Sequence, residues 1–277
     1  MWRVVKYTIL STCIIVFCAC ERVNFDIENH KSKVVVSIDE FKLAHSDIGM
    51  RSNVEKEQIS FAVFDSTRTK ICEVKQVKGE DDEYGKIITE LDVGKYYFVA
   101  VGSHLDCNLL SPDSVEFSEN NTGDVFCGVR EVYVRDGEQI QLNMTLHRCV
   151  TQFRLVCEDG IPANIKSFRF EFTKGNHIVN PQTKHAPSAG VHKVFFASET
   201  PDNTLSCFFF LNDDNVKMNL TVTAIDYEGE EVKTRVFEDL DMEIDKNLTA
   251  TGSFFVSSQT LSVDFNTEWK KSEERKY

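Results

Sequence analysis

The stretch that decides the fold is Gln139-Ile-Gln-Leu-Asn-Met-Thr-Leu146. Apolar and polar residues alternate strictly along it. In an extended strand, whose side chains alternate with a period of two, they therefore lie on opposite faces. The same alternation recurs in segments 168–172, 218–224 and 260–265. No segment keeps apolar residues at the 3.6-residue period of a helix for four turns. The pattern predicts an all-β protein.

The residues before this strand predict a hairpin. Asp136-Gly137 is a common two-residue turn sequence, and it separates the strand from segment 131–135. Two further segments, 59–65 and 96–101, are apolar on both faces, which is typical of strands at the centre of a packed sheet. Two β-sandwiches are the packing that this set of strands favours.

Chain length and a change of pattern near residue 147 divide the chain. The 277 residues suffice for one large or two modest domains. The alternating strand ends at Leu146, and a new apolar run starts at Cys149. We expect a signal peptide over 1–19, an N-terminal sandwich over 20–147, a C-terminal sandwich over 148–265 and a charged tail over 266–277. Each sandwich then has a normal domain size.

The charge balance argues against polyanions as the main partner. The chain has 31 Lys and Arg against 44 Asp and Glu, a net charge of −13. Nucleic acids and anionic membrane surfaces select clustered positive charge, so we expect neither as the main partner. Hydrophobic residues make up 42%, enough for a real core, which argues against a disordered or fibrous chain.

The first twenty residues predict secretion. Arg3 and Lys6 precede an apolar run that is too short for a bilayer span of about 20 residues. The run ends at Ala19-Cys20-Glu21, which resembles a bacterial lipobox, in which the cysteine receives the lipid. We therefore expect lipidation of Cys20. The simpler alternative is a plain signal peptide with incidental cysteines.

The cysteines after Cys20 show no pairing motif. No Cys-x-x-Cys sequence occurs, so neither a zinc ribbon nor a thioredoxin-type site has support. Fifteen pairings are open to six cysteines in an oxidising compartment. We expect mostly buried free thiols at Cys72, Cys107, Cys127, Cys149, Cys157 and Cys207.

No residue pattern predicts catalysis. The sequence lacks GxSxG, HExxH, P-loop and GxGxxG motifs. His177, His185 and His192 fall in one predicted loop, where ordinary surface histidines are the alternative to a metal site. His104 and Cys107 supply only half of a zinc site. We expect no catalytic residue, metal or cofactor, although the carboxylate pair of a glycoside hydrolase needs no local motif.

Four segments resemble, in order, the fimbrillin (Mfa-like) family of type V pilus subunits and anchor lipoproteins of Bacteroidales. They are spread over nearly the whole chain after the signal peptide: 34–38 with 59–65, 91–102, 124–128 with 142–150, and 247–255. The resemblance implies two tandem transthyretin-like β-sandwiches. It also implies a fimbrial (pilus) subunit or pilus anchor at the surface of the outer membrane, with adhesion as the outcome and without catalysis.

The resemblance further implies a maturation path. In polymerising members a protease removes an early strand after an arginine, and a strand from the C-terminal region of a neighbouring subunit fills the groove. Carried over to this chain, the resemblance implies that the removable strand would be Lys33–Asp39 and that the cut would fall between Arg51 and Ser52. Alternatively, Arg51 is simply a surface arginine. The donor strand lies in Gly252–Phe265, with pocket-filling residues Leu261, Val263 and Phe265. Alternatively, this segment is the last strand of the chain's own second domain.

The implied partners are other pilus subunits in a homo- or hetero-polymer, the outer membrane through lipid on Cys20, and a host or bacterial surface receptor. A surface glycan-binding lipoprotein of a nutrient-uptake system is the rival function. It needs an exposed aromatic platform, for which Trp269, Tyr96 and Tyr97 are the candidates, and these residues fit a tail or a core better. A hydrolase is the third choice.

Overall fold

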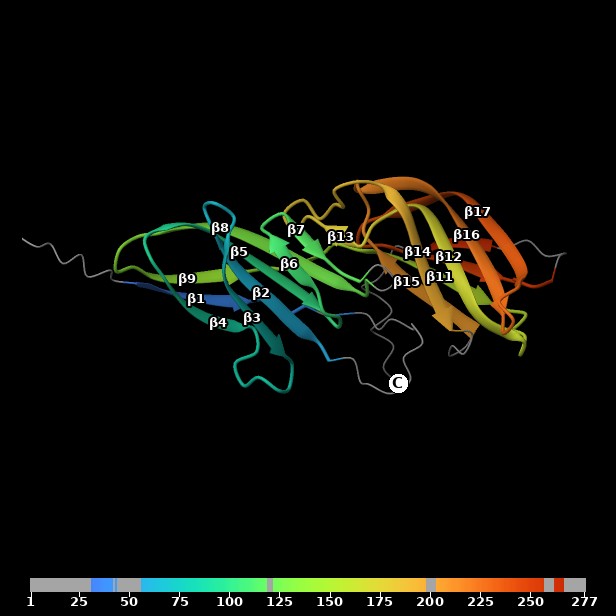
Figure 1. The fold of residues 1–277 in the computed structure, drawn as a ribbon, viewed down its shortest axis with the longest axis horizontal. Helices are drawn as coiled ribbons and strands as arrows, with labels where there is room; N and C mark the ends of the chain where they lie inside the picture. The colour runs from blue at the N-terminus through green and yellow to red at the C-terminus, as the bar shows by residue number, and fades with distance from the viewer. Residues whose placement is uncertain are drawn as a thin grey trace, which may run out of the picture.

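The computed structural model describes residues 31–41, 43, 56–118, 122–197, 203–256 and 262–266. Strands β1 to β19 make up its regular structure, and the described residues contain no α-helix. The prediction of an all-β fold is confirmed. The molecule is elongated, with β1 to β9 gathered at one end and most of β11 to β17 at the other (Figure 1).

The first half contains two sheets that face each other. A three-stranded sheet has the order β4-β1-β9, and a five-stranded sheet has the order β10-β8-β5-β2-β3. Val34 and Val36 of the smaller sheet share one core with Phe61 and Phe98 of the larger one. The strands are β1 (Ser32–Ile38), β2 (Gln58–Asp65), β3 (Lys70–Val77), β4 (Lys86–Leu91), β5 (Gly94–Ser103), β6 (Asn108–Ser111), β7 (Ser114–Glu116), β8 (Val125–Val134), β9 (Gln139–Met144) and β10 (His147–Arg148).

The second half pairs two four-stranded sheets, with the orders β15-β11-β18-β19 and β14-β12-β16-β17. Aromatic rings fill the space between them: Phe153 contacts both Phe172 and Phe237 edge to face, with ring centroids 6.1 and 5.8 Å apart. The strands are β11 (Thr151–Cys157), β12 (Ile165–Gly175), β13 (Ile178–Val179), β14 (Gly190–Ala197), β15 (Thr204–Phe209), β16 (Asn215–Asp226), β17 (Glu231–Glu243), β18 (Asn247–Gly252) and β19 (Ser262–Asn266).

The predicted hairpin at Asp136-Gly137 is wrong. The turn itself forms, with Gly137 at φ 65° and the backbone N–H of Glu138 donating to the carbonyl of Arg135. However, β8 and β9 belong to different sheets. Strand β8 pairs with β5 along its whole length and with the short β10 only at Phe126 and Cys127, whereas β9 pairs with β1. The turn therefore carries the chain from one layer of the sandwich to the other.

The two halves share a third cluster of buried side chains. It joins Ala62 and Val99 of the first half to Phe208 and Phe210 of the second. Strand β13 also crosses over, pairing with β7 in a sheet of order β13-β7-β6. The five-stranded sheet is thus packed on both faces, as the two doubly apolar segments 59–65 and 96–101 predict. Apart from β13, strands up to β10 belong to the sheets of the first half, and strands from β11 onward belong to the sheets of the second half. The domain boundary at residue 147 stays a prediction.

The six cysteines that the structure describes are free thiols, as expected. Four of the six described cysteines are buried, and Cys72 and Cys107 are half-buried. Burial raises the pKa of Cys107 to about 11 and that of Cys157 to about 12. These thiols therefore stay protonated and unreactive at neutral pH.

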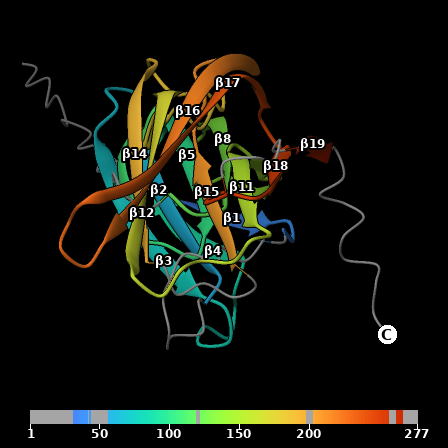
Figure 2. The ribbon, with the colours of Figure 1, turned by 90° about the vertical axis from the view of Figure 1, so that its right-hand side faces the viewer.

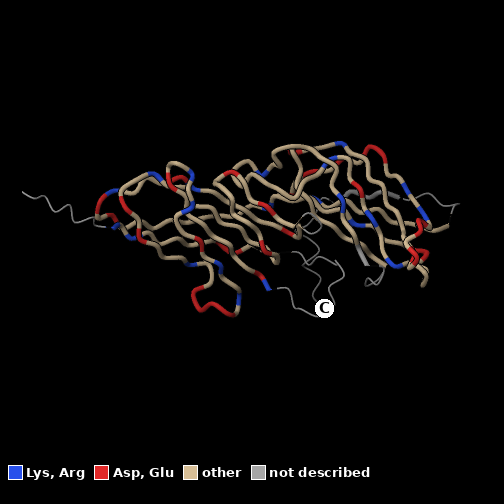
Figure 3. Tube along the Cα trace, in the orientation of Figure 1, with Lys and Arg blue, Asp and Glu red and all other residues tan. Residues whose placement is uncertain are grey.

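Charge on the surface is spread over both halves (Figure 3). The acidic run 80–83 stands at the tip of the long β3–β4 connection, where the carboxylate of Asp81 accepts the backbone N–H of Val77 at 2.6 Å. That run is a solvated turn. Within the part of the chain that the structure describes, no helix has the length and apolar character to cross a membrane.

Candidate functional site: the groove around β1

Strand β1 is the first described strand, yet it lies in the middle of its sheet. It runs antiparallel to β4, from Ser32 opposite Leu91 to Ser37 opposite Lys86. On its other side it runs parallel to β9. A strand with neighbours on both sides has partners for the N–H and C=O groups along both edges. We call the space between β4 and β9 that this strand fills the β1 groove.

The side chains of β1 contribute to the hydrophobic core. Val34 and Val36 point into the core of the first half, and both are 0% exposed. Burying a valine side chain contributes about 1.5–3 kcal/mol. Without β1, this core would be open to water and the facing edges of β4 and β9 would lack partners. An empty β1 groove would therefore bind another strand strongly.

Both ends of β1 are fixed by hydrogen bonds to the chain around β9. The hydroxyl of Ser32 donates to the carbonyl of Arg135 at 2.5 Å and accepts the backbone N–H of Glu138 at 3.2 Å. At the other end, the backbone N–H of Asp39 donates to the carbonyl of Met144 at 3.0 Å. These contacts help to hold the strand in one register. The hydrophobic core favours the same register, because a slip by one residue would turn the apolar face of the strand to solvent.

A buried aromatic residue follows β1. Phe41 is 8% exposed and lies against Gly102 of β5 and beside Phe126 of β8. Sequence reasoning missed these three residues. The usable signal was Gly102, because an isolated glycine within a strand often marks a close approach by another part of the chain.

Strand β19 stands in a different position, at the edge of its sheet (Figure 2). It pairs only with β18, with Val263 opposite Ala250 and Phe265 opposite Leu248. Two of the three predicted donor residues, Val263 and Phe265, thus lie in a strand that pairs within its own chain. Leu261 lies outside the described residues, as do Cys20, Arg51, Ser52 and Trp269.

The segment before β19 is held by a clamp. The carboxylate of Asp159 accepts the backbone N–H groups of Phe254, Phe255 and Val256 at 2.7–3.0 Å. The guanidinium of Arg235 donates to the carbonyls of Phe254 and Val256 at 2.9 and 2.7 Å. Burial acts to raise the pKa of Asp159, but the three backbone donors outweigh it and lower this pKa. The chain is thus fixed up to Val256.

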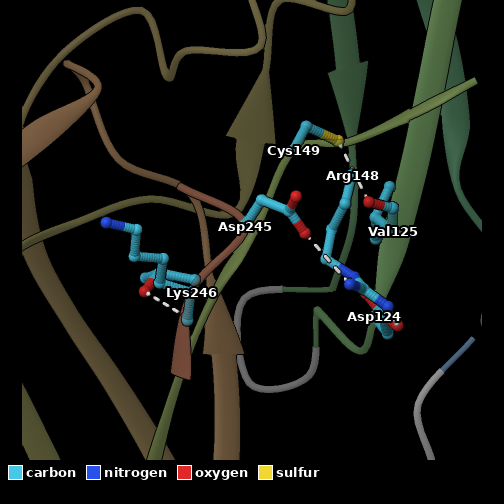
Figure 4. A network of polar contacts seen from close by, with 7 residues as sticks. Asp124, Val125, Arg148, Cys149, Asp245 and Lys246 are labelled. Atoms are coloured by element: carbon cyan, nitrogen blue, oxygen red, sulfur yellow. Dashed lines mark hydrogen bonds and ion pairs between the residues drawn. The ribbon is translucent and has the colours of Figure 1, made fainter. Parts of the chain in front are cut away.

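A charged network joins the two halves (Figure 4). Arg148 of β10 binds the fully buried carboxylate of Asp124 through Nε at 2.9 Å and Nη2 at 3.1 Å. Its Nη1 donates to Asp245, which follows β17, at 3.0 Å. A bidentate arginine–carboxylate pair fixes the relative orientation of its two groups. Breaking a buried pair costs about 3–5 kcal/mol. This network therefore helps to set how the two halves meet.

The histidines do not share a site. His185 lies 3.0 Å from Asp214, and His177 lies 3.9 Å from Glu116. The prediction that His192 belongs to the same surface loop is wrong, because it lies in β14 and is 4% exposed. Burial lowers the pKa of His192 to about 4. No group of three or more His, Cys, Asp or Glu among the described residues is arranged to hold a metal ion.

The two tyrosines considered for glycan binding are not an exposed platform. Tyr96 is buried, and its hydroxyl donates to the carbonyl of Asp92 at 3.0 Å. Tyr97 packs partly buried against the cluster shared by the two halves, with the ammonium of Lys95 5.3 Å from its ring centroid. Both side chains are accounted for by packing within the fold.

Comparison with known proteins identifies the family. Residues 108–276, more than half of the chain, match the family described as "Family of unknown function (DUF6562)", and the chain belongs to that family. No curated protein matches the chain in sequence.

Solved structures of proteins from Bacteroides, Porphyromonas and Parabacteroides are similar to this chain at low identity. A protein from Bacteroides thetaiotaomicron, described as a candidate polysaccharide-binding protein (DUF1812), has a TM-score of 0.49 at 12% identity, covering 86% of this chain and 99% of that one. The fimbrial anchor protein Mfa2 from Porphyromonas gingivalis has a TM-score of 0.45 at 12% identity, covering 86% and 98%. A fimbrial assembly protein from Parabacteroides distasonis has a TM-score of 0.44 at 10% identity, covering 85% and 98%.

Proposed function

We propose that this member of the family is a fimbrial (pilus) subunit or pilus anchor, a lipoprotein on the cell surface that assembles by β-strand exchange and supports adhesion. One observation carries the proposal: the first described strand is the central strand of its sheet, held between β4 and β9. The rest of the proposal draws on the lipobox-like Ala19-Cys20 sequence and on the resemblance of four ordered segments to pilus subunits.

The position of β1 suits a strand that is removed and replaced. Its connection to β2 includes residues 44–55, where Arg51 is the proposed cleavage site. Cleavage there would leave β1 attached to the rest of the chain only through hydrogen bonds and buried side chains. Loss of β1 would then open the β1 groove, which a strand from another subunit would fill by strand addition.

Strand β19 is the proposed donor. It is an edge strand with one partner, so its release exposes one edge of β18 and leaves the other strands of that sheet paired. The Asp159–Arg235 clamp would hold the chain at Val256 while the residues after it reach a neighbouring subunit. Edge strands are the usual templates for pairing between chains.

The fate of Cys20 separates the two roles. An anchor keeps its lipid and its β1, so that it remains in the outer membrane at the base of the fibre. A polymerising subunit loses both when the chain is cut between Arg51 and Ser52. Departure of the cleaved segment would thus release the subunit from the membrane and open its groove together.

The test is the intact mass of the native protein extracted from outer membranes. A mass that starts at acylated Cys20 identifies an anchor, and one that starts at Ser52 identifies a polymerising subunit. The Arg51→Ala variant is the control, because it should convert the second mass into the first. Two results together would contradict the proposal. One is recovery of a monomeric, unacylated chain that begins at neither residue, and the other is normal fibres on cells that lack the protein.

A further inference from the structure

One row of residues crosses the five-stranded sheet on the face toward β1. The strand registers place Ile59 of β2 opposite Gly102 of β5, Gly102 opposite Phe126 of β8, and Phe126 opposite Arg148 of β10. Residues directly opposite each other in antiparallel strands point to the same face of the sheet. Gly102 is therefore a gap in a row of large side chains.

The ring of Phe41 fills this gap. A Cβ atom placed on Gly102 would lie 2.3 Å from the Phe41 ring, so no other residue at position 102 would leave room for it. The ring centroid of Phe41 lies 5.5 Å from that of Phe126, and the guanidinium carbon of Arg148 lies 4.6 Å from the Phe126 ring. We call the space over Gly102, bordered by Phe126, the Phe41 pocket.

We propose that the Phe41 pocket is a recognition site for an aromatic side chain on whichever strand occupies the β1 groove. This inference rests on the proposed function, since it concerns the subunit strand that replaces β1. Its ligand is an extended peptide segment of another subunit. That segment carries two aliphatic residues at alternate positions, corresponding to Val34 and Val36. Five positions after the second aliphatic residue it carries an aromatic residue, corresponding to Phe41.

The pocket adds selectivity that the groove alone lacks. The ladder hydrogen bonds of β4 and β9 involve only backbone groups, so they accept any extended sequence. The sites of Val34 and Val36 lie in a core that accepts aliphatic side chains in general. An aromatic ring buries far more surface, so its loss should weaken binding of the strand about 10- to 100-fold.

The experiment uses the full mature chain with a protease site placed in segment 44–55. The folded protein is cut there, and its β1 segment is then displaced by synthetic peptides that span residues 31–43. We expect the native peptide and its Glu40→Ala version to compete equally, because Glu40 is exposed. The Phe41→Ala peptide should compete about 10- to 100-fold less well. Equal competition by the Phe41→Ala peptide would overturn the proposal.

A variant of the pocket supplies the reciprocal test. In Gly102→Ala protein the added methyl group occupies the place of the ring, so the native peptide should lose its advantage over the Phe41→Ala peptide. If the fold does not survive this change, the double variant with Phe41→Ala restores the space. An advantage that persists in Gly102→Ala protein refutes the pocket.

Failure of the pocket and failure of strand exchange give different results. If no peptide displaces β1, strand exchange fails, and the recognition role fails with it. If peptides displace β1 regardless of residue 41, strand exchange stands and only the pocket fails. Selective displacement in a protein that never joins a fibre in cells supports the pocket and removes the pilus assignment.

Discussion

Strands β1 and β19 occupy opposite situations in the molecule. Strand β1 has a partner on each side, and its valines lie in the core of the first half. Strand β19 has one partner and lies at the edge of the second half. Removal of β1 opens a core, whereas removal of β19 exposes one strand edge. The comparison teaches that the position of a strand in its sheet, rather than how well its sequence alternates, decides which backbone groups its loss would expose.

The largest effect is expected inside β1. Val36→Asp would place an unpaired carboxylate in the core shared with Phe61 and Phe98, and should destabilise the protein by at least about 4 kcal/mol. Thermal unfolding of purified protein measures this effect. The matched control is Lys33→Asp, in the same strand but exposed, which should change the stability little. Similar melting temperatures for the two variants would show that β1 does not support the core.

Acid should act on the half that contains β19. The pKa of His192 is about 4, below the usual 6.5, because burial opposes its charged form. The unfolded state therefore binds a proton first as the pH falls, and stability present above pH 6.5 is lost between pH 6.5 and 4, on the order of 3 kcal/mol.

Stability measured by denaturant unfolding at several pH values checks this prediction. His192→Leu should flatten the profile in that range, and His147→Leu, at an exposed position, should not. An unchanged slope in His192→Leu would assign the acid sensitivity to other groups. Hydrogen exchange should also place the early loss of protection in the second half rather than around β1.

The clamp before β19 should have an intermediate effect. Asp159→Ala removes the acceptor of three backbone N–H groups and should cost about 2 kcal/mol. It should also raise hydrogen exchange in segment 253–256. The exposed Asp82, changed to Ala, is the control for loss of one negative charge. Unaltered exchange in segment 253–256 would mean that Arg235 alone holds it.

The smallest effect is expected from β19 itself. A chain that ends at Val256 should remain folded and lose less than about 2 kcal/mol, because Phe254 and the rest of the second core stay in place. Circular dichroism and a melting curve measure this. Unfolding of the second half in the shortened chain would identify β19 as intrinsic to the domain and remove it as a donor.

The sequence predicted what depends on local patterning. The alternation at 139–146 marked β9 (Gln139–Met144) correctly, and the doubly apolar segments marked β2 and β5. The partner of β9 was not predictable, because the turn chemistry of Asp136-Gly137 is compatible with a hairpin and with a crossing between layers. The parallel pairing places Lys33 opposite Gln139, far apart along the sequence, and no local pattern encodes which of the strands meet.

The candidate site was predicted in part. The proposed removable strand, Lys33–Asp39, overlaps β1 (Ser32–Ile38), but its place between β4 and β9 carries no local signal. Phe41 has no local feature that sets it apart in a chain rich in aromatic residues. Its ring lies in the space left by Gly102, which is far along the sequence, so only the folded structure brings the two together. The lipid and cleavage sites, Cys20 and Arg51, lie outside the described residues and stay predictions.

The parallel pairing of β1 and β9 also governs the order in which the chain can fold. Asp39, next to β1, bonds with Thr145, 106 residues later, so the first described strand must wait for most of its own half to be synthesised. Contacts so distant along the chain form slowly, because a long loop has to close first. The β1 groove, whose walls are β4 and β9, therefore exists only after β9 has been made, and its closure by β1 is expected among the later steps of folding.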